Sequence, residues 1–116
     1  MAEWKEIHTL DEWSEVIKTS DQDPVLLLKH STTCPISANA WQECQRFVAD
    51  DAVPNVNYVI VKVIESRPVS NQIADELAVK HESPQLILIN HRKAVWNTSH
   101  WSITGDNIGT ALSNIK

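Results

Sequence analysis

The chain has 116 residues, of which 42% are hydrophobic and 22% are charged, with a formal net charge of -5. A chain of this length fits one domain, expected over residues 1–116, which folds without disulfides or a structural metal. Its ten basic residues are scattered, which argues against nucleic acid as a partner. No stretch approaches the ~20 apolar residues of a membrane span, so no membrane partner is expected. Because the N-terminus also lacks the apolar core of a signal peptide, we expect a cytoplasmic protein.

The first part of the chain predicts a helix followed by a buried strand. Residues 10–19 carry apolar side chains on one face, and Thr9 and Glu12 have the spacing of a capping box. The uninterrupted apolar run 25–28 is typical of a strand that is buried on both faces.

The remaining predicted elements continue this alternation and include a hairpin. They are a helix over 35–50, a strand over 58–64, a helix over 70–81, strands over 86–89 and 94–96, and a closing helix over 104–115, with a short strand at 4–8 as an optional first element. His91-Arg92-Lys93 is interpreted as a charged hairpin turn that faces water. This order predicts an α/β protein with a central mixed sheet flanked by helices.

The segment that carries chemistry lies between the strand at 25–28 and the next helix. Proline is favoured at the first position of a helix, so Pro35 places Cys34 at the N-cap. A sulfur there faces the free N–H groups of the first turn and the positive end of the helix dipole, and both favour the thiolate. We therefore expect Cys34 to be a nucleophile. The alternative is an inert capping residue, although Ser, Thr, Asp and Asn are better caps.

Three other residues bear on how Cys34 would react. Cys44 lies on the apolar stripe of the same helix, which predicts core packing, and ten helical residues span about 15 Å, too far for a disulfide to Cys34. Ser37 stands three residues after Cys34, where a dithiol oxidoreductase carries its second cysteine, so the sequence predicts a monothiol. Its hydroxyl either donates to the thiolate across one turn or is purely structural. His30 is interpreted as a packed, hydrogen-bonded histidine rather than a proton shuttle.

One stretch is similar to a known family signature. It reads His30-Ser31-Thr32-Thr33-Cys34-Pro35-Ile36-Ser37, and with the later Ser83-Pro84 it resembles the thioredoxin superfamily and, more narrowly, the monothiol bacilliredoxins. These are redox proteins of bacteria that use bacillithiol instead of glutathione. The resemblance covers nearly the whole chain and implies a thioredoxin-like fold. It implies catalysis by Cys34, a thiolate stabilised by Pro35, Ile36 and Ser37, and substrate binding by Thr33, Ser83 and Pro84.

The resemblance also implies the geometry around Pro84. In thioredoxin-like folds a cis-proline faces the active cysteine, and the backbone of the preceding residue, here Ser83, pairs with the substrate chain as an added strand. An ordinary trans proline that opens a strand is the alternative.

One departure from the thioredoxin pattern concerns Leu28, which stands where thioredoxins carry a buried acid that assists attack by the second cysteine. Its replacement fits a monothiol mechanism.

The function that the resemblance implies is removal of bacillithiol from S-bacillithiolated client proteins through the Cys34 thiolate. Bacillithiol is then a co-substrate, a bacillithiol-disulfide reductase system recycles it, and no metal is expected. Two alternatives stay open: a glutaredoxin-like [2Fe–2S] cluster shared between two subunits, and a non-catalytic adaptor with a thioredoxin fold.

Overall fold

A mixed five-stranded sheet forms the centre of the protein in the computed structural model, which describes residues 3–115. Its strands are β1 (Trp4–Glu6), β2 (Val25–His30), β3 (Asn57–Lys62), β4 (Gln85–Asn90) and β5 (Lys93–Ser99), in the spatial order β1-β3-β2-β4-β5. The first three are mutually parallel, whereas β4 runs antiparallel to β2 and β5 antiparallel to β4. The predicted α/β class and mixed sheet are confirmed.

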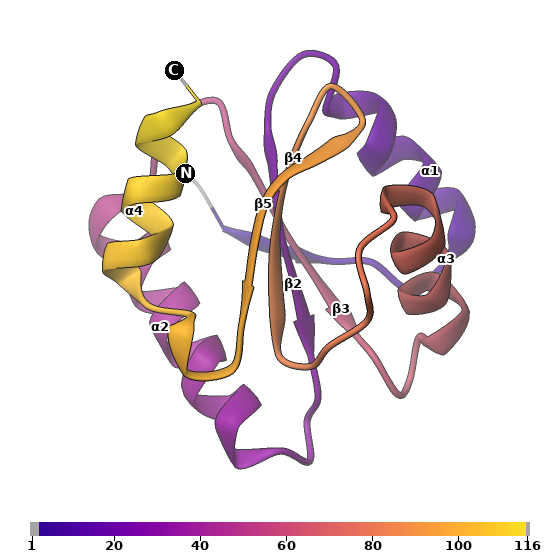
Figure 1. The fold of residues 1–116 in the computed structure, drawn as a ribbon, viewed down its shortest axis with the longest axis horizontal. Coiled ribbons are helices and arrows are strands. Elements are labelled where there is room, and N and C mark those ends of the chain that lie inside the picture. The colour runs from indigo at the N-terminus through magenta and orange to yellow at the C-terminus, as the bar shows by residue number, and fades with distance from the viewer. Residues whose placement is uncertain (1–2, 116) are drawn as a thin grey trace.

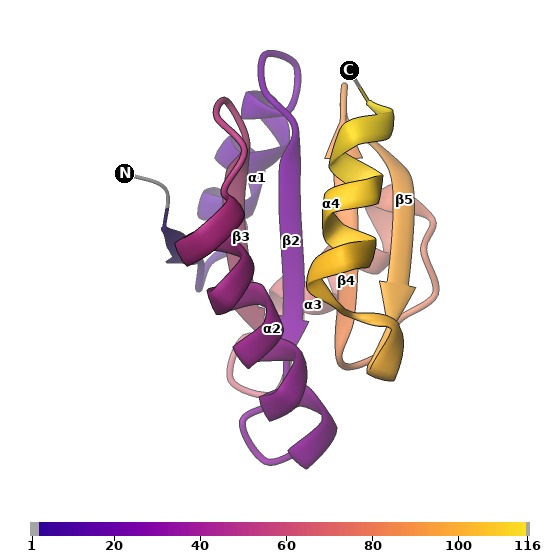
Figure 2. The ribbon, with the colours of Figure 1, turned by 90° about the vertical axis from the view of Figure 1, so that its left-hand side faces the viewer.

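Four α-helices cover the two faces of this sheet. They are α1 (Leu10–Thr19), α2 (Pro35–Asp51), α3 (Arg67–Leu77) and α4 (Gly105–Asn114), with a short 3-10 helix η1 (His100–Ser102) before α4. In Figure 1, α2 and α4 lie on one side of the sheet and α1 and α3 on the other. Figure 2 looks onto the sheet from the side of α2 and α4. None of these helices is long and apolar enough to cross a membrane.

The central strand β2 supports both layers. Val25 and Leu27 belong to the core beneath α1 and α3, whereas Leu26 and Leu28 belong to the core beneath α2 and α4. All four are completely buried, which confirms the predicted strand with two buried faces. The strand runs on to His30, two residues beyond the apolar run, because hydrogen bonds to β3 continue past it.

The helix predicted over 70–81 has different bounds in the structure. It begins at Arg67, since Pro68 is well suited to the first helical turn and Ser66 forms the N-cap. It ends at Leu77 because Ala78 adopts a left-handed conformation (φ 55°) that terminates the helix. The residues between α3 and β4 therefore form an irregular connection, residues 78–84, at the place where the sequence predicted the last turn of a helix.

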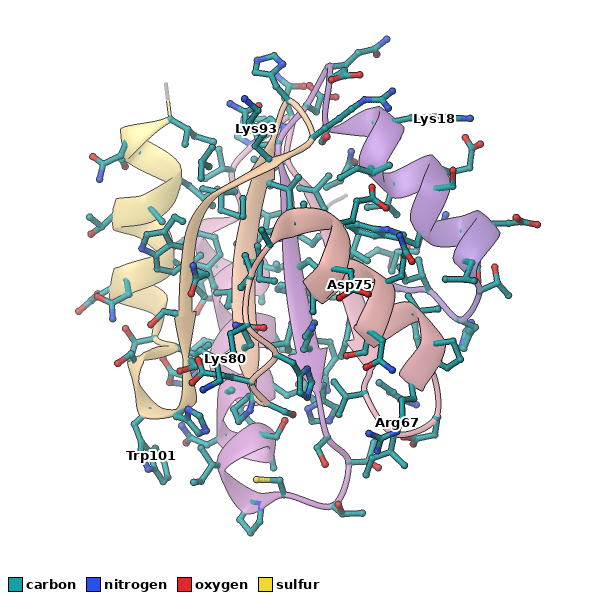
Figure 3. All side chains as sticks on the ribbon, turned by 45° about the vertical axis from the view of Figure 1, so that its right-hand side comes forward. Lys18, Arg67, Asp75, Lys80, Lys93 and Trp101 are labelled. Carbon is teal, nitrogen blue, oxygen red and sulfur yellow. The ribbon has the colours of Figure 1, made fainter. Side chains whose placement is uncertain are left out.

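The β4–β5 hairpin turns at His91 and Arg92, both with positive φ (51° and 65°). Their backbone N–H groups donate to the carbonyl oxygen and the hydroxyl of Ser20, which compensates for the absence of glycine. Figure 3 shows Lys93 at this end of the sheet and Trp101 of η1 at the other. The predicted charged turn is confirmed, and it lies far from the start of α2.

The opposite end of the sheet gathers the chemistry-bearing segments, and we call it the site end. There β2 ends at His30, β4 begins at Gln85 and β5 ends at Ser99. The register joins these points, because Gln85 pairs with Lys29 on one side and with Ser99 on the other. Segments that are far apart in sequence therefore meet beside the N-terminus of α2.

Cys44 lies inside the core, as its position on the apolar stripe predicts. Its side chain is 0% exposed and belongs to the cluster that includes Leu26, Phe47 and Tyr58. Burial, with a smaller contribution from Glu43, raises the pKa of the Cys44 thiol to about 12. This thiol is neutral and inaccessible at physiological pH.

We therefore expect the folded chain to react at one thiol only. Intact-mass measurement after brief exposure to iodoacetamide should show a single adduct under native conditions and two adducts in denaturant, because unfolding exposes Cys44. A second adduct that forms in the native protein as fast as the first would contradict the burial of Cys44.

Candidate active site

Cys34 is the N-cap residue of α2, as the sequence predicts. Its backbone is extended (φ -107°, ψ 123°), Pro35 lies in the first turn, and the N–H of Ala38 donates to the carbonyl oxygen of Cys34 over 3.0 Å. The residue is partly exposed and its thiol is free. A free thiol on a partly exposed residue thus lies at the positive end of a 17-residue helix.

The sulfur makes no capping hydrogen bond to the first turn of α2. The expectation of direct N–H contacts to this atom is therefore wrong for this conformation. The physical reason is that a thiol sulfur is a weak acceptor, whereas the residues that cap best offer an oxygen. The helix dipole remains as the contribution of α2 that favours the thiolate.

Ser37 is completely buried and its hydroxyl joins α2 to the end of β2. The oxygen accepts from the N–H of Ser31 over 2.9 Å and lies 2.8 Å from Nδ1 of His30. These contacts match the second of the two alternatives, a structural serine, and they occupy the hydroxyl in place of a hydrogen bond to Cys34. The reason is local competition, because the hydroxyl has only one proton and a ring nitrogen lies within its reach.

His30 is packed and hydrogen-bonded, which confirms its interpretation. It is 7% exposed, and its ring lies 6.0 Å from that of Trp41. Burial lowers the pKa of His30, and the nearby Lys62 lowers it further, so the ring is neutral at neutral pH. When Nδ1 carries no proton, it accepts from the hydroxyl of Ser37; when it carries one, it donates to the oxygen of Ser37.

The loop between His30 and Cys34 is held by short polar contacts. The hydroxyls of Ser31 and Thr33 lie 3.2 Å apart, and Thr32 donates to a carboxylate oxygen of Glu65 over 3.3 Å. Thr33 is exposed directly beside Cys34. Sequence reasoning missed Glu65, because no motif marks it. Glu65 lies near this loop only because β3 ends beside β2.

Pro35 and Ile36 bring no polar side-chain atom to Cys34. Pro35 is exposed and Ile36 is half-buried in the first turn of α2. Any support that they give the thiolate therefore comes through the backbone and the start of the helix. Their role in stabilising the thiolate stays a prediction.

The peptide bond between Ser83 and Pro84 is cis, which confirms the cis state that the resemblance implied. Pro84 is buried and directly precedes Gln85 at the start of β4, so it lies at the site end of the sheet. Its carbonyl oxygen accepts from the N–H of His100 over 3.1 Å, which ties it to η1. Substrate binding by Thr33, Ser83 and Pro84 stays a prediction.

Sequence reasoning also missed an exposed tryptophan at the site end. Trp101 of η1 is 65% exposed, and Figure 3 shows it pointing away from the sheet. The sequence gives only a weak signal for this exposed side chain, because each of the five tryptophans is expected to pack in the core or at its rim. Within residues 3–115, no three His, Cys, Asp or Glu side chains come together in a way that could hold a metal ion.

Comparisons with known proteins agree with this geometry. The family model "Monothiol bacilliredoxin BrxC" matches residues 5–108. A solved structure of a provisionally assigned oxidoreductase with a thioredoxin fold is similar with a TM-score of 0.83 and 32% identity, over 94% of this chain and 93% of that one.

Two thioredoxins share the fold at lower identity. One is from Malassezia sympodialis (TM-score 0.77, 16% identity, over 98% of this chain and 91% of that one). The other is thioredoxin f from spinach chloroplast (TM-score 0.74, 12% identity, over 97% and 93%). With a lone accessible cysteine at the start of α2 and a cis-proline at the same end of the sheet, the chain belongs to the monothiol bacilliredoxin family and is a thiol oxidoreductase with a thioredoxin fold.

Proposed function

We propose that this protein removes bacillithiol from S-bacillithiolated proteins by thiol–disulfide exchange at Cys34. One observation carries the proposal: the accessible thiol at the N-cap of α2 has a serine, not a cysteine, three residues later. The family match to the bacilliredoxins supports bacillithiol as the small thiol that is exchanged.

The reaction consists of two successive thiol–disulfide exchanges. The Cys34 thiolate attacks the bacillithiol sulfur of the mixed disulfide, so a bond forms between Cys34 and bacillithiol while the bond to the client cysteine breaks. The client leaves as a thiolate and takes a proton from solvent. A second bacillithiol thiolate then attacks the bacillithiol sulfur held on Cys34, which frees Cys34 and yields bacillithiol disulfide. A bacillithiol-disulfide reductase system supplies the electrons that return this product to two thiols.

The client segment would bind beside the cis-proline. The backbone of Ser83 is the group that would pair with it as an added strand, and Thr33 flanks Cys34 on the other side. The position of Ser83-Pro84 at the site end of the sheet supports this arrangement, because it lies beside the loop that leads to Cys34.

The first step should leave a stable adduct. Ser37 has no thiol, and Cys44 is buried with a strongly raised pKa, so neither can displace bacillithiol from Cys34. Release then depends on a thiol from solution. The lifetime of the Cys34 adduct should therefore fall as the concentration of free bacillithiol rises.

Replacement of Cys34 by Ala should abolish bacillithiol removal, since no other thiol can reach the disulfide. The measurement is intact mass of both partners after mixing with a bacillithiolated client, and the wild-type chain should gain one bacillithiol. The matched control Cys44→Ala should keep this activity. Unchanged client turnover by Cys34→Ala would refute the proposal, and visible absorbance that depends on Cys34 would instead indicate a bound iron–sulfur cluster.

Replacement of Ser37 by Cys should convert the monothiol into a dithiol. A cysteine three residues into the helix can attack the Cys34 adduct, so bacillithiol should leave without a second bacillithiol and the chain should lose two hydrogens on oxidation. Ser37→Thr, which keeps a hydroxyl, is the control and should keep the long-lived adduct. If Ser37→Cys holds its adduct as long as the wild-type chain does, Ser37 does not determine the monothiol behaviour.

A further inference from the structure

A lone ammonium group is buried beneath α3. Lys29 lies on β2 and is 0% exposed, and its Nζ donates to the carbonyl oxygen of Ser70 over 3.1 Å and contacts Nδ1 of His81 at 3.2 Å. Burial lowers the pKa of Lys29 to about 8. Among the described residues, no Asp or Glu forms an ion pair with it. A buried charge without a counterion is costly, so its contacts need an explanation.

The contact with His81 has a definite donor. A lysine ammonium can only donate, so Nδ1 of His81 must be the unprotonated acceptor. Burial and the nearby Lys29 both lower the pKa of His81, which agrees with a neutral ring. Arg67 lowers this pKa as well, whereas Glu82 raises it. At neutral pH the pair therefore consists of a charged donor and a neutral acceptor.

The groups around Lys29 hold the connection between α3 and β4, residues 78–84. His81 belongs to it, and so does Lys80, which Figure 3 shows on this segment. Gln85, the cross-strand neighbour of Lys29, is 1% exposed and donates from Nε2 to the carbonyl oxygen of Lys80 over 3.0 Å. Two adjacent residues of the connection are thus held by buried side chains of neighbouring strands. Gln85 of β4 holds Lys80, and Lys29 of β2 holds His81.

This attachment lies between the two segments that make up the site. On one side, Lys29 directly precedes His30, and β2 leads from there to Cys34. On the other side, His81 lies two residues before Ser83, at the cis peptide bond. A single side chain of β2 therefore binds the segment that presents Pro84.

We propose that Lys29 is a positioning residue that fixes residues 78–84, and with them Ser83-Pro84, for docking of the client protein. The inference rests on the proposed function, in which this segment receives the client chain. It assigns Lys29 to client affinity and not to the reactivity of the sulfur, because its side chain contacts α3 and the connection rather than the first turn of α2.

Two variants test this from opposite ends of the contact. Lys29→Met keeps an unbranched side chain that is one atom shorter and removes the charge. Because the variant removes a buried charge that has no counterion, loss of fold is not the expected effect. His81→Ala removes the acceptor from the exposed side and leaves the bond from Lys29 to Ser70. Lys80→Met is the control, because it removes a charge from the same connection without touching the buried contacts.

In both variants we expect KM for a bacillithiolated client protein to rise about tenfold with kcat nearly unchanged, the effect of losing one hydrogen bond to a charged group. The alkylation rate of Cys34 by iodoacetamide should stay within about twofold of wild type, and the double variant should be no worse than the worse single one. An unchanged KM, or alkylation that slows as much as client turnover, would overturn the inference.

Amide hydrogen exchange tests the positioning role even if the proposed function fails. In Lys29→Met and His81→Ala, exchange should accelerate within residues 78–84 and stay unchanged in β2 and β3, whereas Lys80→Met should behave as wild type. A wild-type chain that does not turn over a bacillithiolated client would refute the proposed function alone. Exchange within 78–84 that does not change in either variant would refute the role of Lys29.

Discussion

The hydroxyl of Ser37 joins the two elements on which the site depends. Through its contacts with His30 and the N–H of Ser31, it fixes the first turn of α2 against the end of β2. Since β2 is paired on both sides and buried on both faces, its end is among the best-fixed points of the sheet. Cys34 lies between these two elements, so its position follows from how Ser37 joins them.

A dithiol thioredoxin would carry its second cysteine at the position of Ser37. Here a hydroxyl replaces that thiol. It holds α2 against the end of β2 through hydrogen bonds, whereas the second thiol of a dithiol enzyme takes part in the reaction. Leu28 likewise brings an apolar side chain to the core where thioredoxins have a buried acid. Both replacements remove groups that serve an intramolecular disulfide in thioredoxins. Cys34, the start of α2 and the cis-proline remain, and these are the parts to which the proposed function assigns the reaction with a mixed disulfide.

The sequence predicts the features of the site that depend on local chemistry. Pro35 predicts the start of α2 and hence the N-cap position of Cys34, and the apolar stripe predicts the burial of Cys44. The capping box of Thr9 and Glu12 is also present, since it is a short-range pattern. Features of this kind need only neighbours in the chain.

Features that depend on long-range packing could not be predicted. Lys29 and His81 are 52 residues apart in the chain, and only the register of β2 with β4 and the early end of α3 bring them together. The direction of the Ser37 hydroxyl was left open for the same reason, because the burial of His30 against Ser37 is a tertiary property. The prediction that the Ser83-Pro84 bond is cis rested on family resemblance and not on physical reasoning, since most X–Pro bonds are trans.

The central claim is that the N-terminus of α2 makes the sulfur of Cys34 the reactive nucleophile of the folded chain, and its rate of alkylation tests this most directly. The Cys44→Ala variant leaves one reporting thiol, whose rate with iodoacetamide is compared in the folded and the urea-unfolded chain. At pH 7 we expect the folded chain to react about tenfold faster than the unfolded one, because only the folded chain places this sulfur at the positive end of a helix. A folded chain that reacts no faster than the unfolded one would contradict the claim.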